Sequence, residues 1–197
     1  MGKFIKRLFD LVLALILFVP ASLVLLCGIL FVKIVSPEAS PIFKQERGGY
    51  KRKLFTLFKL RSMTNERDEN GELLPDEGRL KKGGKIVRAT NMDELFQIWN
   101  ILKGEMSIIG PRPALWNQYD LIAERDKYGA NDILPGLTGW AQVHGRDELE
   151  IEEKAKLDGY YVKHLGFKLD VQCFFLTIKS VLKSEGVVEG KKDNLNK

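Results

Sequence analysis

The longest feature in the hydrophobic pattern is an uninterrupted apolar run near the N-terminus. Residues Leu11 to Val32 carry no charged side chain, and the run exceeds the roughly 20 residues that a helix needs to cross a bilayer. It is too long for the apolar part of a cleaved signal peptide, so we expect it to remain in the protein. The pattern therefore predicts a membrane helix over residues 1–35.

Two features of this run favour a bent helix. Pro20 lies near its middle, where it removes a backbone donor and leaves the carbonyl of Ile16 without a helical partner. Ser22 can donate to the carbonyl of Phe18 and deepen the bend. Basic residues flank the run on both sides, and a re-entrant helix would keep both flanks in the cytosol. A single-pass anchor with a tolerated proline is the alternative, since bent spanning helices are common.

After this run the pattern changes to short elements. Two strands are predicted around Gly48-Gly49, a glycine pair typical of a hairpin. Residues 64–85 are charged and glycine-rich, which predicts a solvated, mobile loop. From about Met92 to Lys103 the apolar residues recur at helical spacing, and Gly104 is a suitable stop. Three further helices are predicted: an amphipathic one at residues 115–129, a polar one at roughly 147–163 and one with a broad apolar face at about 169–185.

These elements predict an α+β, mostly helical fold. We expect an N-terminal re-entrant membrane helix (1–35), a cytosolic domain with a short β-hairpin (36–188) and a disordered polar tail (189–197). Amphipathic helices beside a membrane segment suit the lipid interface, so they are expected to surround a small core there. Helical periodicity alone does not distinguish them from the helices of a small soluble core.

Composition narrows the chemistry only in part. The chain has 197 residues and a formal net charge of +5, which suits anionic lipid, phosphorylated substrates or nucleic acid. It contains two cysteines and two histidines, and no CxxC motif, so neither a zinc site nor a disulfide framework is indicated. Any metal is expected to be a hard ion such as Mg²⁺, bound by carboxylates and phosphates.

The segment TNMDELFQ places two acids, Asp93 and Glu94, at the start of a predicted helix. Asn91 is a suitable N-cap with Glu94 three residues later, so a helix cap alone explains the pair. The helical phase turns Asp93 away from the apolar stripe and Glu94 towards it, and different surroundings can give two carboxylates different roles. A carboxylate beside Mg²⁺ can also attack a phosphoryl group, which is the functional alternative.

Cations lie on several segments around this pair. Phosphoryl transfer needs them, because the phosphoryl oxygens carry charge in the transition state. Pro111 and Pro113 restrict Arg112, which therefore loses less freedom on binding a phosphate. The other candidates are Lys59 at the end of a strand, Arg88 before the acidic pair and Arg146 after a glycine-rich loop.

Four segments in order along the chain resemble the bacterial sugar transferases, the monotopic phosphoglycosyl transferases. They are KRLFDLVLAL, FKLRSM, TNMDELFQIWNILKGEMSIIGPRP and LPGLTGWAQVHGR, and the resemblance covers about residues 3–188. It implies a membrane-bound enzyme on the cytosolic face of the bacterial inner membrane, with residues 36–188 as its catalytic domain. Such enzymes transfer a sugar-1-phosphate from a UDP-sugar to polyprenyl (undecaprenyl) phosphate and release UMP. This step begins surface glycan or glycoprotein glycan assembly, which downstream glycosyltransferases continue.

The resemblance also implies roles for individual residues. Asp93 would be the nucleophile that forms a covalent phosphosugar intermediate and would help to hold Mg²⁺, while Glu94 would assist. The phosphate-binding residues would be Lys59, Arg88, Arg112 and Arg146, with Pro111 and Pro113 packed near the nucleotide base.

Two positions depart from the family pattern. The family bends its membrane helix at a Ser-Pro pair, whereas here Val19 precedes Pro20 and the serine is Ser22. His144 stands where asparagine is usual, and we expect it to satisfy a local hydrogen bond.

Two other functions remain open on the sequence. One is a membrane-anchored UDP-sugar hydrolase with water as the acceptor. The other is a non-enzymatic basic module that binds lipid. Nucleic acid is not an expected partner, because no helix-turn-helix, zinc-finger or RNA-binding signature is present.

Overall fold

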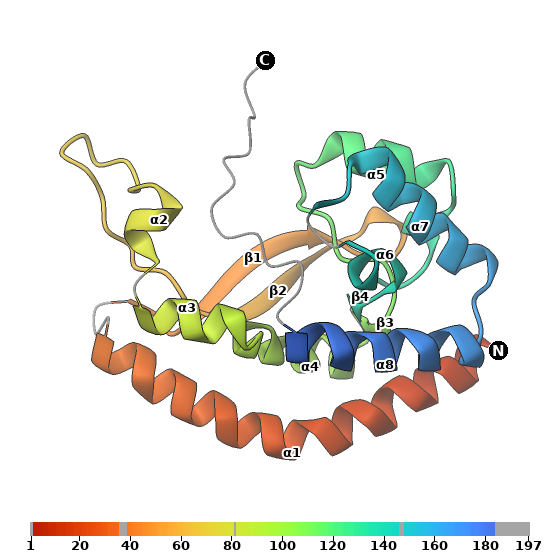
Figure 1. Cartoon of the computed structure of the whole chain (residues 1–197), viewed down its shortest axis with the longest axis horizontal. Helices are drawn as coiled ribbons and strands as arrows, with labels where there is room; N and C mark the ends of the chain where they lie inside the picture. The colour runs from red at the N-terminus through yellow and green to blue at the C-terminus, as the bar shows by residue number, and fades with distance from the viewer. Residues whose placement is uncertain (1, 36–38, 81, 146–147, 184–197) are drawn as a thin grey trace.

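A computed structural model describes residues 2–35, 39–80, 82–145 and 148–183. One long helix, α1 (Lys3–Val35), bows along the base of the protein, and the rest of the chain packs on its concave side (Figure 1). By length and composition, Phe4–Ile34 could cross a membrane. The prediction of a mostly helical α+β protein with one long apolar N-terminal helix is confirmed. The expected disordered tail, 189–197, lies outside the described residues.

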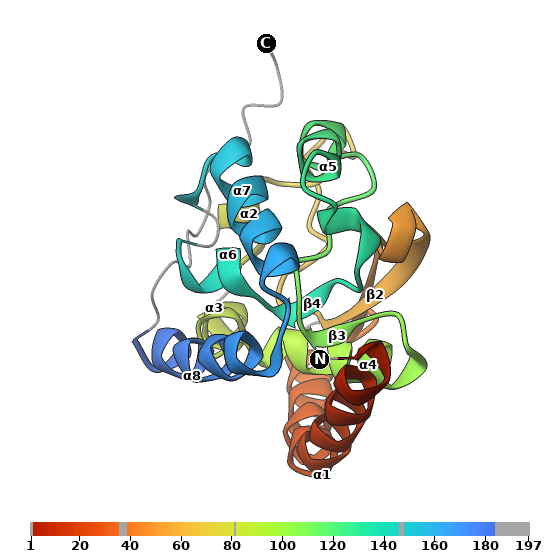
Figure 2. The same cartoon turned by 90° about the vertical axis from the view of Figure 1, so that its right-hand side faces the viewer.

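The remaining elements are short. The strands and their connecting turn are β1 (Ile42–Gly48), η1 (Tyr50–Arg52), β2 (Leu54–Leu60), β3 (Ser107–Ile109) and β4 (Gly136–Thr138). The helices are α2 (Asp76–Arg79), α3 (Lys82–Ala89), η2 (Met92–Phe96), α4 (Gln97–Lys103), α5 (Tyr119–Asp126), η3 (Ala130–Asp132), α6 (Trp140–Val143), α7 (Ile151–Lys163) and α8 (Phe167–Lys183). Figure 2 shows α4 and α8 beside α1 at the base, with α5 and α7 on the opposite side.

The predicted hairpin is present. β1 and β2 pair antiparallel from Ile42↔Leu60 to Gly48↔Leu54. The amide of Gly49 donates to the carbonyl of Lys53 at 2.9 Å and closes the turn. Alternate residues of a strand share one face, so the register places Lys59 on the same hairpin face as the odd-numbered residues of β1.

A second sheet was not predicted. β3 and β4 pair parallel in only three residues each, with Ser107↔Gly136 and Ile109↔Thr138. The two segments approach so closely that a Cβ added to Gly139 would lie 2.0 Å from the carbonyl oxygen of Gly110. Three residues are too few to show the alternation of apolar and polar side chains that is typical of a strand. The glycines that permit the close contact look like ordinary loop residues in the sequence.

The helix predicted from Met92 to Lys103 is divided into the 3₁₀ turn η2 and the α-helix α4. Asn91 is the N-cap residue of η2, as predicted, but the predicted capping by its side chain is wrong, because its backbone is left-handed (φ 52°) and it makes no side-chain cap hydrogen bond. An N-cap residue normally has an extended backbone from which its side chain reaches the first turn. Gly104 ends α4 with φ 86°, as predicted.

The prediction of an unstructured loop over residues 64–85 is also wrong in part. The chain forms α2 there and begins α3, which continues to Ala89. The aromatic ring of Phe31 on α1 lies where a Cβ on Gly83 would stand, so α3 packs on α1. Tertiary packing therefore overrides the weak helix propensity of this glycine-containing segment.

Helix α1 is joined to the core by polar contacts as well as apolar ones. Asp10 is 1% exposed and accepts hydrogen bonds from Ser107 Oγ at 2.8 Å and from the Ile108 amide at 3.0 Å. Lys6 Nζ pairs with Asp170 of α8 at 2.9 Å. The N-terminal half of α1 is thus fixed to the strand β3 and to the last helix.

The side-chain hydrogen bond near Pro20 differs from the one predicted. Ser22 Oγ donates to the carbonyl of Val19 at 2.7 Å, not to that of Phe18. The serine therefore bonds three residues back, within the turn that contains Pro20.

Candidate active site

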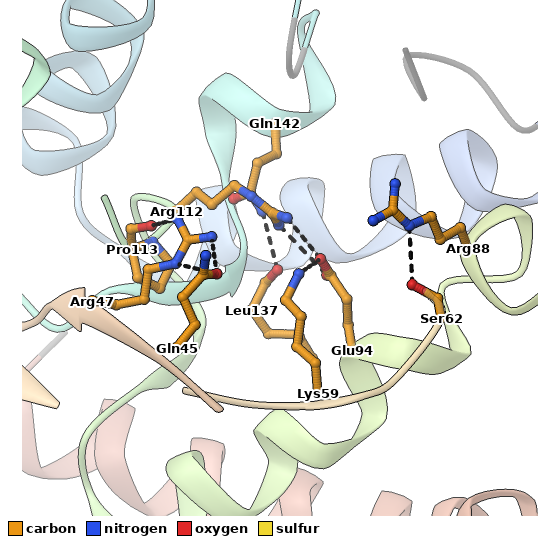
Figure 3. Close-up of polar contacts among 10 residues, drawn as sticks. All are labelled: Gln45, Arg47, Lys59, Ser62, Arg88, Glu94, Arg112, Pro113, Leu137 and Gln142. Carbon is orange, nitrogen blue, oxygen red and sulfur yellow. Dashed lines mark hydrogen bonds and ion pairs between the residues drawn. The ribbon is translucent and has the colours of Figure 1, made fainter. Parts of the chain in front are cut away.

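Glu94 is the centre of a cluster of cations on the concave side of α1 (Figure 3). Its Oε1 lies 2.7 Å from Arg112 Nη2 and 3.2 Å from Lys59 Nζ, and its Oε2 lies 3.5 Å from Arg112 Nη1. Glu94 is largely buried, so these charge-assisted contacts offset the cost of removing its carboxylate from water. The structure therefore places three of the predicted residues together, with Glu94 as the fixed acid of the pair.

Asp93 has a different environment. It is partly buried and takes part in no hydrogen bond or ion pair with another residue that the structure describes. Burial raises its pKa above the ordinary value and the nearby charge of Glu94 adds to this, while Lys59, Arg88 and Arg112 act in the opposite direction. A carboxylate without a fixed partner in a cationic setting is available to bind a metal ion or attack an electrophile.

Lys59 links the acidic pair to the hairpin. It is the penultimate residue of β2, and burial lowers its pKa against the opposing influence of Glu94. On the same hairpin face, Arg47 donates to Gln45 Oε1 from Nη2 at 2.6 Å and to the carbonyl of Pro113 from Nη1 at 3.0 Å. The sequence analysis did not select Arg47 or Gln45. Their alternation with Lys59 across the hairpin was the available signal.

The segment Pro111–Pro113 separates the acidic cluster from a cavity of about 360 Å³. Both prolines are buried, and the carbonyl of Arg112 accepts a hydrogen bond from Arg125 Nη1 at 2.8 Å. Arg125 is itself buried and paired with Asp158 at 2.6 Å. This buried pair fixes the backbone of the segment, so that Arg112 can direct its guanidinium towards Glu94. The residues that line the cavity include Pro111, Arg112, Pro113, Arg125, Gly49, Arg52, Trp116, Tyr119 and Asn131.

Arg88 stands apart from the Glu94 cluster. Its Nε donates to Ser62 Oγ at 3.1 Å, and Figure 3 shows it on the far side of Glu94 from Arg112. Its charge still lowers the pKa of Asp93. Lys59, Arg88 and Arg112 therefore all act on the charge of Asp93, while the predicted residue Arg146 lies outside the described residues.

His144 and Gln142, both in the predicted glycine-rich segment, have different surroundings. His144 makes the expected local contact, with Nδ1 2.8 Å from the carbonyl oxygen of Trp140. Gln142, which the sequence analysis did not select, reaches from α6 towards Arg112 in Figure 3. A lone glutamine in a short helix carries no signal of its own in a single sequence.

The donor set suits a hard cation only with help from a substrate. No group of three or more His, Cys, Asp or Glu residues that could hold a metal occurs among the described residues. Mg²⁺ is commonly bound by one or two carboxylates together with substrate phosphates. Asp93 offers a carboxylate of this kind, whereas Glu94 is held by Arg112 and Lys59.

An acidic pair with cations around it is the arrangement that phosphoryl transfer requires, and here it stands on a fold built along an apolar helix of membrane length. The comparison with known families agrees with this class. Residues 1–184 match the family described as bacterial sugar transferase, and the chain belongs to that family.

Individual relatives share most of this chain. The uncharacterized sugar transferase EpsL of Bacillus subtilis (strain 168) is 45% identical over 93% of this chain and 90% of its own length. UDP-N-acetylgalactosamine-undecaprenyl-phosphate N-acetylgalactosaminephosphotransferase of Aeromonas hydrophila is 36% identical over 93% of this chain. UDP-glucose:undecaprenyl-phosphate glucose-1-phosphate transferase of Escherichia coli (strain K12) is 35% identical over 90% of it. The matched region is only 45% and 40% of these two longer relatives.

Proposed function

We propose that this protein transfers a sugar-1-phosphate from a UDP-sugar to undecaprenyl phosphate and releases UMP. The observation that carries the proposal is the division of the acidic pair. Glu94 is held by Arg112 and Lys59, whereas the adjacent Asp93 has no fixed partner among the described residues. The names of the longer relatives agree with this substrate class.

The proposed chemistry proceeds through Asp93 in two displacements. First, a carboxylate oxygen of Asp93 attacks the β-phosphorus of the donor, and the bond from that phosphorus to the bridging oxygen breaks. UMP leaves with the bridging oxygen and its electron pair. A phosphate oxygen of undecaprenyl phosphate then attacks the same phosphorus, which releases Asp93 as a carboxylate and forms the lipid-linked diphosphosugar.

The surrounding residues would serve these steps electrostatically. Arg112, Lys59 and Arg88 provide positive charge where the phosphoryl oxygens become more negative in each transition state. Asp93 would hold Mg²⁺ together with the donor pyrophosphate, and the ion would neutralise part of the charge on the leaving UMP. Glu94 keeps Arg112 and Lys59 in place, so it assists the reaction by fixing these two cations.

The cavity beside Pro111 and Pro113 suits the nucleoside. Its volume of about 360 Å³ lies within the range of small-ligand sites. The aromatic rings of Trp116 and Tyr119 and the charge of Arg52 could contact a base and its ribose. Because Arg112 lines this cavity and also contacts Glu94, a nucleotide seated there would direct its phosphates towards the acidic pair.

The proposed location is the cytosolic face of the bacterial inner membrane, with α1 as a re-entrant helix. Both ends of α1 turn towards the same side in Figure 1, where the rest of the protein lies. Helices α4 and α8 lie beside α1 in Figure 2, and they carry exposed apolar side chains, including Trp99, Phe175 and Ile178. A site at this depth could reach a soluble donor and an acceptor phosphate at the level of the lipid headgroups.

One assay tests this proposal against its alternatives. Purified protein is incubated with Mg²⁺, a panel of UDP-sugars and undecaprenyl phosphate, and both UMP and lipid-linked sugar are measured. UMP release that depends on undecaprenyl phosphate is the expected result. Equal release without the lipid would instead identify a hydrolase, and no release with any donor would identify a binding module.

A further inference from the structure

The side-chain amide of Asn131 is held in one orientation beside the cavity assigned to the nucleoside. Asn131 belongs to the turn η3, which follows α5, and it lines this cavity. Its Nδ2 donates to the carbonyl of Ile122 at 2.8 Å and to Asp126 Oδ1 at 2.7 Å. Both partners are acceptors, so a flipped amide would bring oxygen against oxygen and lose both bonds. The NH₂ end is therefore held by α5, and Oδ1 is the end left for a ligand.

The carboxylate that holds Asn131 also holds a donor of the same cavity. Asp126 Oδ2 lies 3.0 Å from Arg52 Nη2, and Arg52 is another lining residue. The side chains of Arg52 and Asp126 are 64% and 33% exposed, so their ion pair adds little to the stability of the fold. Its effect is instead one of position, because the two oxygens of Asp126 hold an acceptor group and a donor group at one end of the cavity.

Asn131 Oδ1 differs in kind from the other polar side-chain groups of the cavity lining. It accepts no hydrogen bond from any residue that the structure describes, and it is not a buried atom. A ligand in the cavity can therefore reach it. The remaining polar side chains of the lining are donors only, except for the hydroxyl of Tyr119, which can act either way: Arg52, Arg112, Trp116 and Arg125.

The position of Asn131 relative to the acidic pair indicates which part of a nucleotide it meets. Asn131 is bonded to α5, which lies on the opposite side of the protein from α1 and α4 (Figure 2). Glu94 lies in η2, directly before α4, and Arg112 both contacts Glu94 and lines the cavity. The phosphates of a bound nucleotide belong at the Arg112 end. The base, at the other end of the nucleotide, then lies against Asn131 and Arg52.

We propose that Asn131 Oδ1 accepts a hydrogen bond from the N3–H group of uracil, while Arg52 donates to a neighbouring carbonyl of the base. This inference rests on the proposed function. Uracil carries one N–H between two carbonyl groups, which matches a fixed acceptor beside a donor. Cytosine in the same position sets its N3 acceptor against Oδ1, and a polar group left unpaired in this way lowers affinity. Asn131 thus selects a uracil nucleotide as the donor.

Calorimetry on the full chain in lipid nanodiscs tests this contact with nucleoside monophosphates. The ligands are UMP, its N3-methyl derivative, CMP and 2′-deoxy-UMP, which is included because a ribose hydroxyl could donate to the same oxygen. The proteins are the unmodified chain and Asn131→Leu, since leucine is close to asparagine in shape but offers no acceptor. Asn117→Leu is the matched control, because Asn117 is exposed and lies outside the cavity lining.

The expected result is a loss of base selectivity in one variant only. The unmodified protein should bind the N3-methyl derivative and CMP at least about tenfold more weakly than UMP. In Asn131→Leu the affinity for UMP should fall about tenfold, and the preference for UMP over these two analogues should nearly disappear. The effect of the 2′-deoxy substitution should be the same in both proteins, and Asn117→Leu should keep every ratio.

Several results would overturn the inference. Equal affinities of the unmodified protein for UMP and its N3-methyl derivative, or no binding of UMP, would reject a contact with N3–H. An unchanged preference in Asn131→Leu would assign the contact to another residue, and a changed 2′-deoxy effect would assign Oδ1 to the ribose. If Asn131→Leu fails to fold, Asn131→Ser replaces it with the same expectations, because its hydroxyl can still donate to α5 but is shorter. UMP release in the presence of undecaprenyl phosphate reports on the proposed function separately, so the two can fail independently.

Discussion

Asp93→Asn and Glu94→Gln remove the same charge from neighbouring residues, yet we expect their effects on stability to differ. Asp93 has no fixed partner among the described residues, and burial disfavours its charged form. An amide there removes a charge that costs free energy in the folded state. Glu94, by contrast, forms ion pairs with Arg112 at 2.7 Å and with Lys59 at 3.2 Å.

The size of the difference follows from these contacts. Removing one partner of a buried ion pair costs about 3–5 kcal/mol because the other charge stays buried. The side chain of Glu94 is 11% exposed, and those of Lys59 and Arg112 are 16% and 26% exposed. Solvent therefore screens the two cations in part, and we expect Glu94→Gln to cost about 2–4 kcal/mol. In a chain of this size that lowers Tm by about 5–15 °C, while Asp93→Asn should leave Tm unchanged or slightly raised.

Thermal denaturation in lipid nanodiscs measures the stability of both variants, and UMP release measures their activity. Asp93→Asn should show no UMP release above background in spite of its unchanged Tm, because the proposed nucleophile is missing. Glu94→Gln should lose both stability and most activity. A fall in Tm for Asp93→Asn as large as that for Glu94→Gln would refute the division of roles between the two acids.

Three further outcomes are expected. Because Asp93 must be ionised to attack and its pKa is raised, kcat/KM should fall on acidification at a pH above that of an ordinary carboxyl group. Lys59→Met should move this fall to still higher pH, which a pH–rate profile would detect; an unchanged profile would exclude Asp93 as the titrating group. Gly139→Ala should abolish activity and lower Tm, since its Cβ would lie 2.0 Å from a backbone oxygen, and a fully active variant would show that the β3–β4 contact is dispensable. Cysteines at Lys3 and Lys33 should both resist labelling from outside the cell, and labelling of one end would establish a spanning helix.

The sequence predicted those parts of the fold that have a long apolar run or a strong turn signal. The apolar run of α1, the hairpin at Gly48-Gly49 and the end of α4 at Gly104 are of this kind. The parallel pair β3–β4 was missed because three residues cannot show a period. The prediction of a side-chain cap failed because the local residue types do not indicate the left-handed backbone of Asn91 (φ 52°).

The residues of the site also divide into those that the sequence predicted and those that it missed. Chemistry-bearing residues in recognisable motifs, namely Asp93, Glu94 and Arg112, were predicted, and the contacts of Glu94 with Arg112 and Lys59 are now visible. Which acid would be held and which left unpaired depends on distances between segments far apart in the chain. The contribution of Arg47 and Gln142 depends in the same way on strand register and on the contact between β3 and β4.

The contacts of α1 impose an order on biosynthesis. Lys6 and Asp170 are 164 residues apart in the chain. The hydrogen bonds of Asp10 cannot form before Ser107 and Ile108 have been synthesised. Helix α1 leaves the ribosome before the segments that it contacts, and the residue that pairs with its Lys6 follows about 10–30 s later at ordinary rates of synthesis. Until Ser107 and Ile108 have been made, Asp10 lacks its partners, so a factor that shields α1 or delays its insertion would assist folding. Transplanting α1 onto an unrelated protein would therefore deliver a helix with an uncompensated carboxylate rather than a neutral anchor.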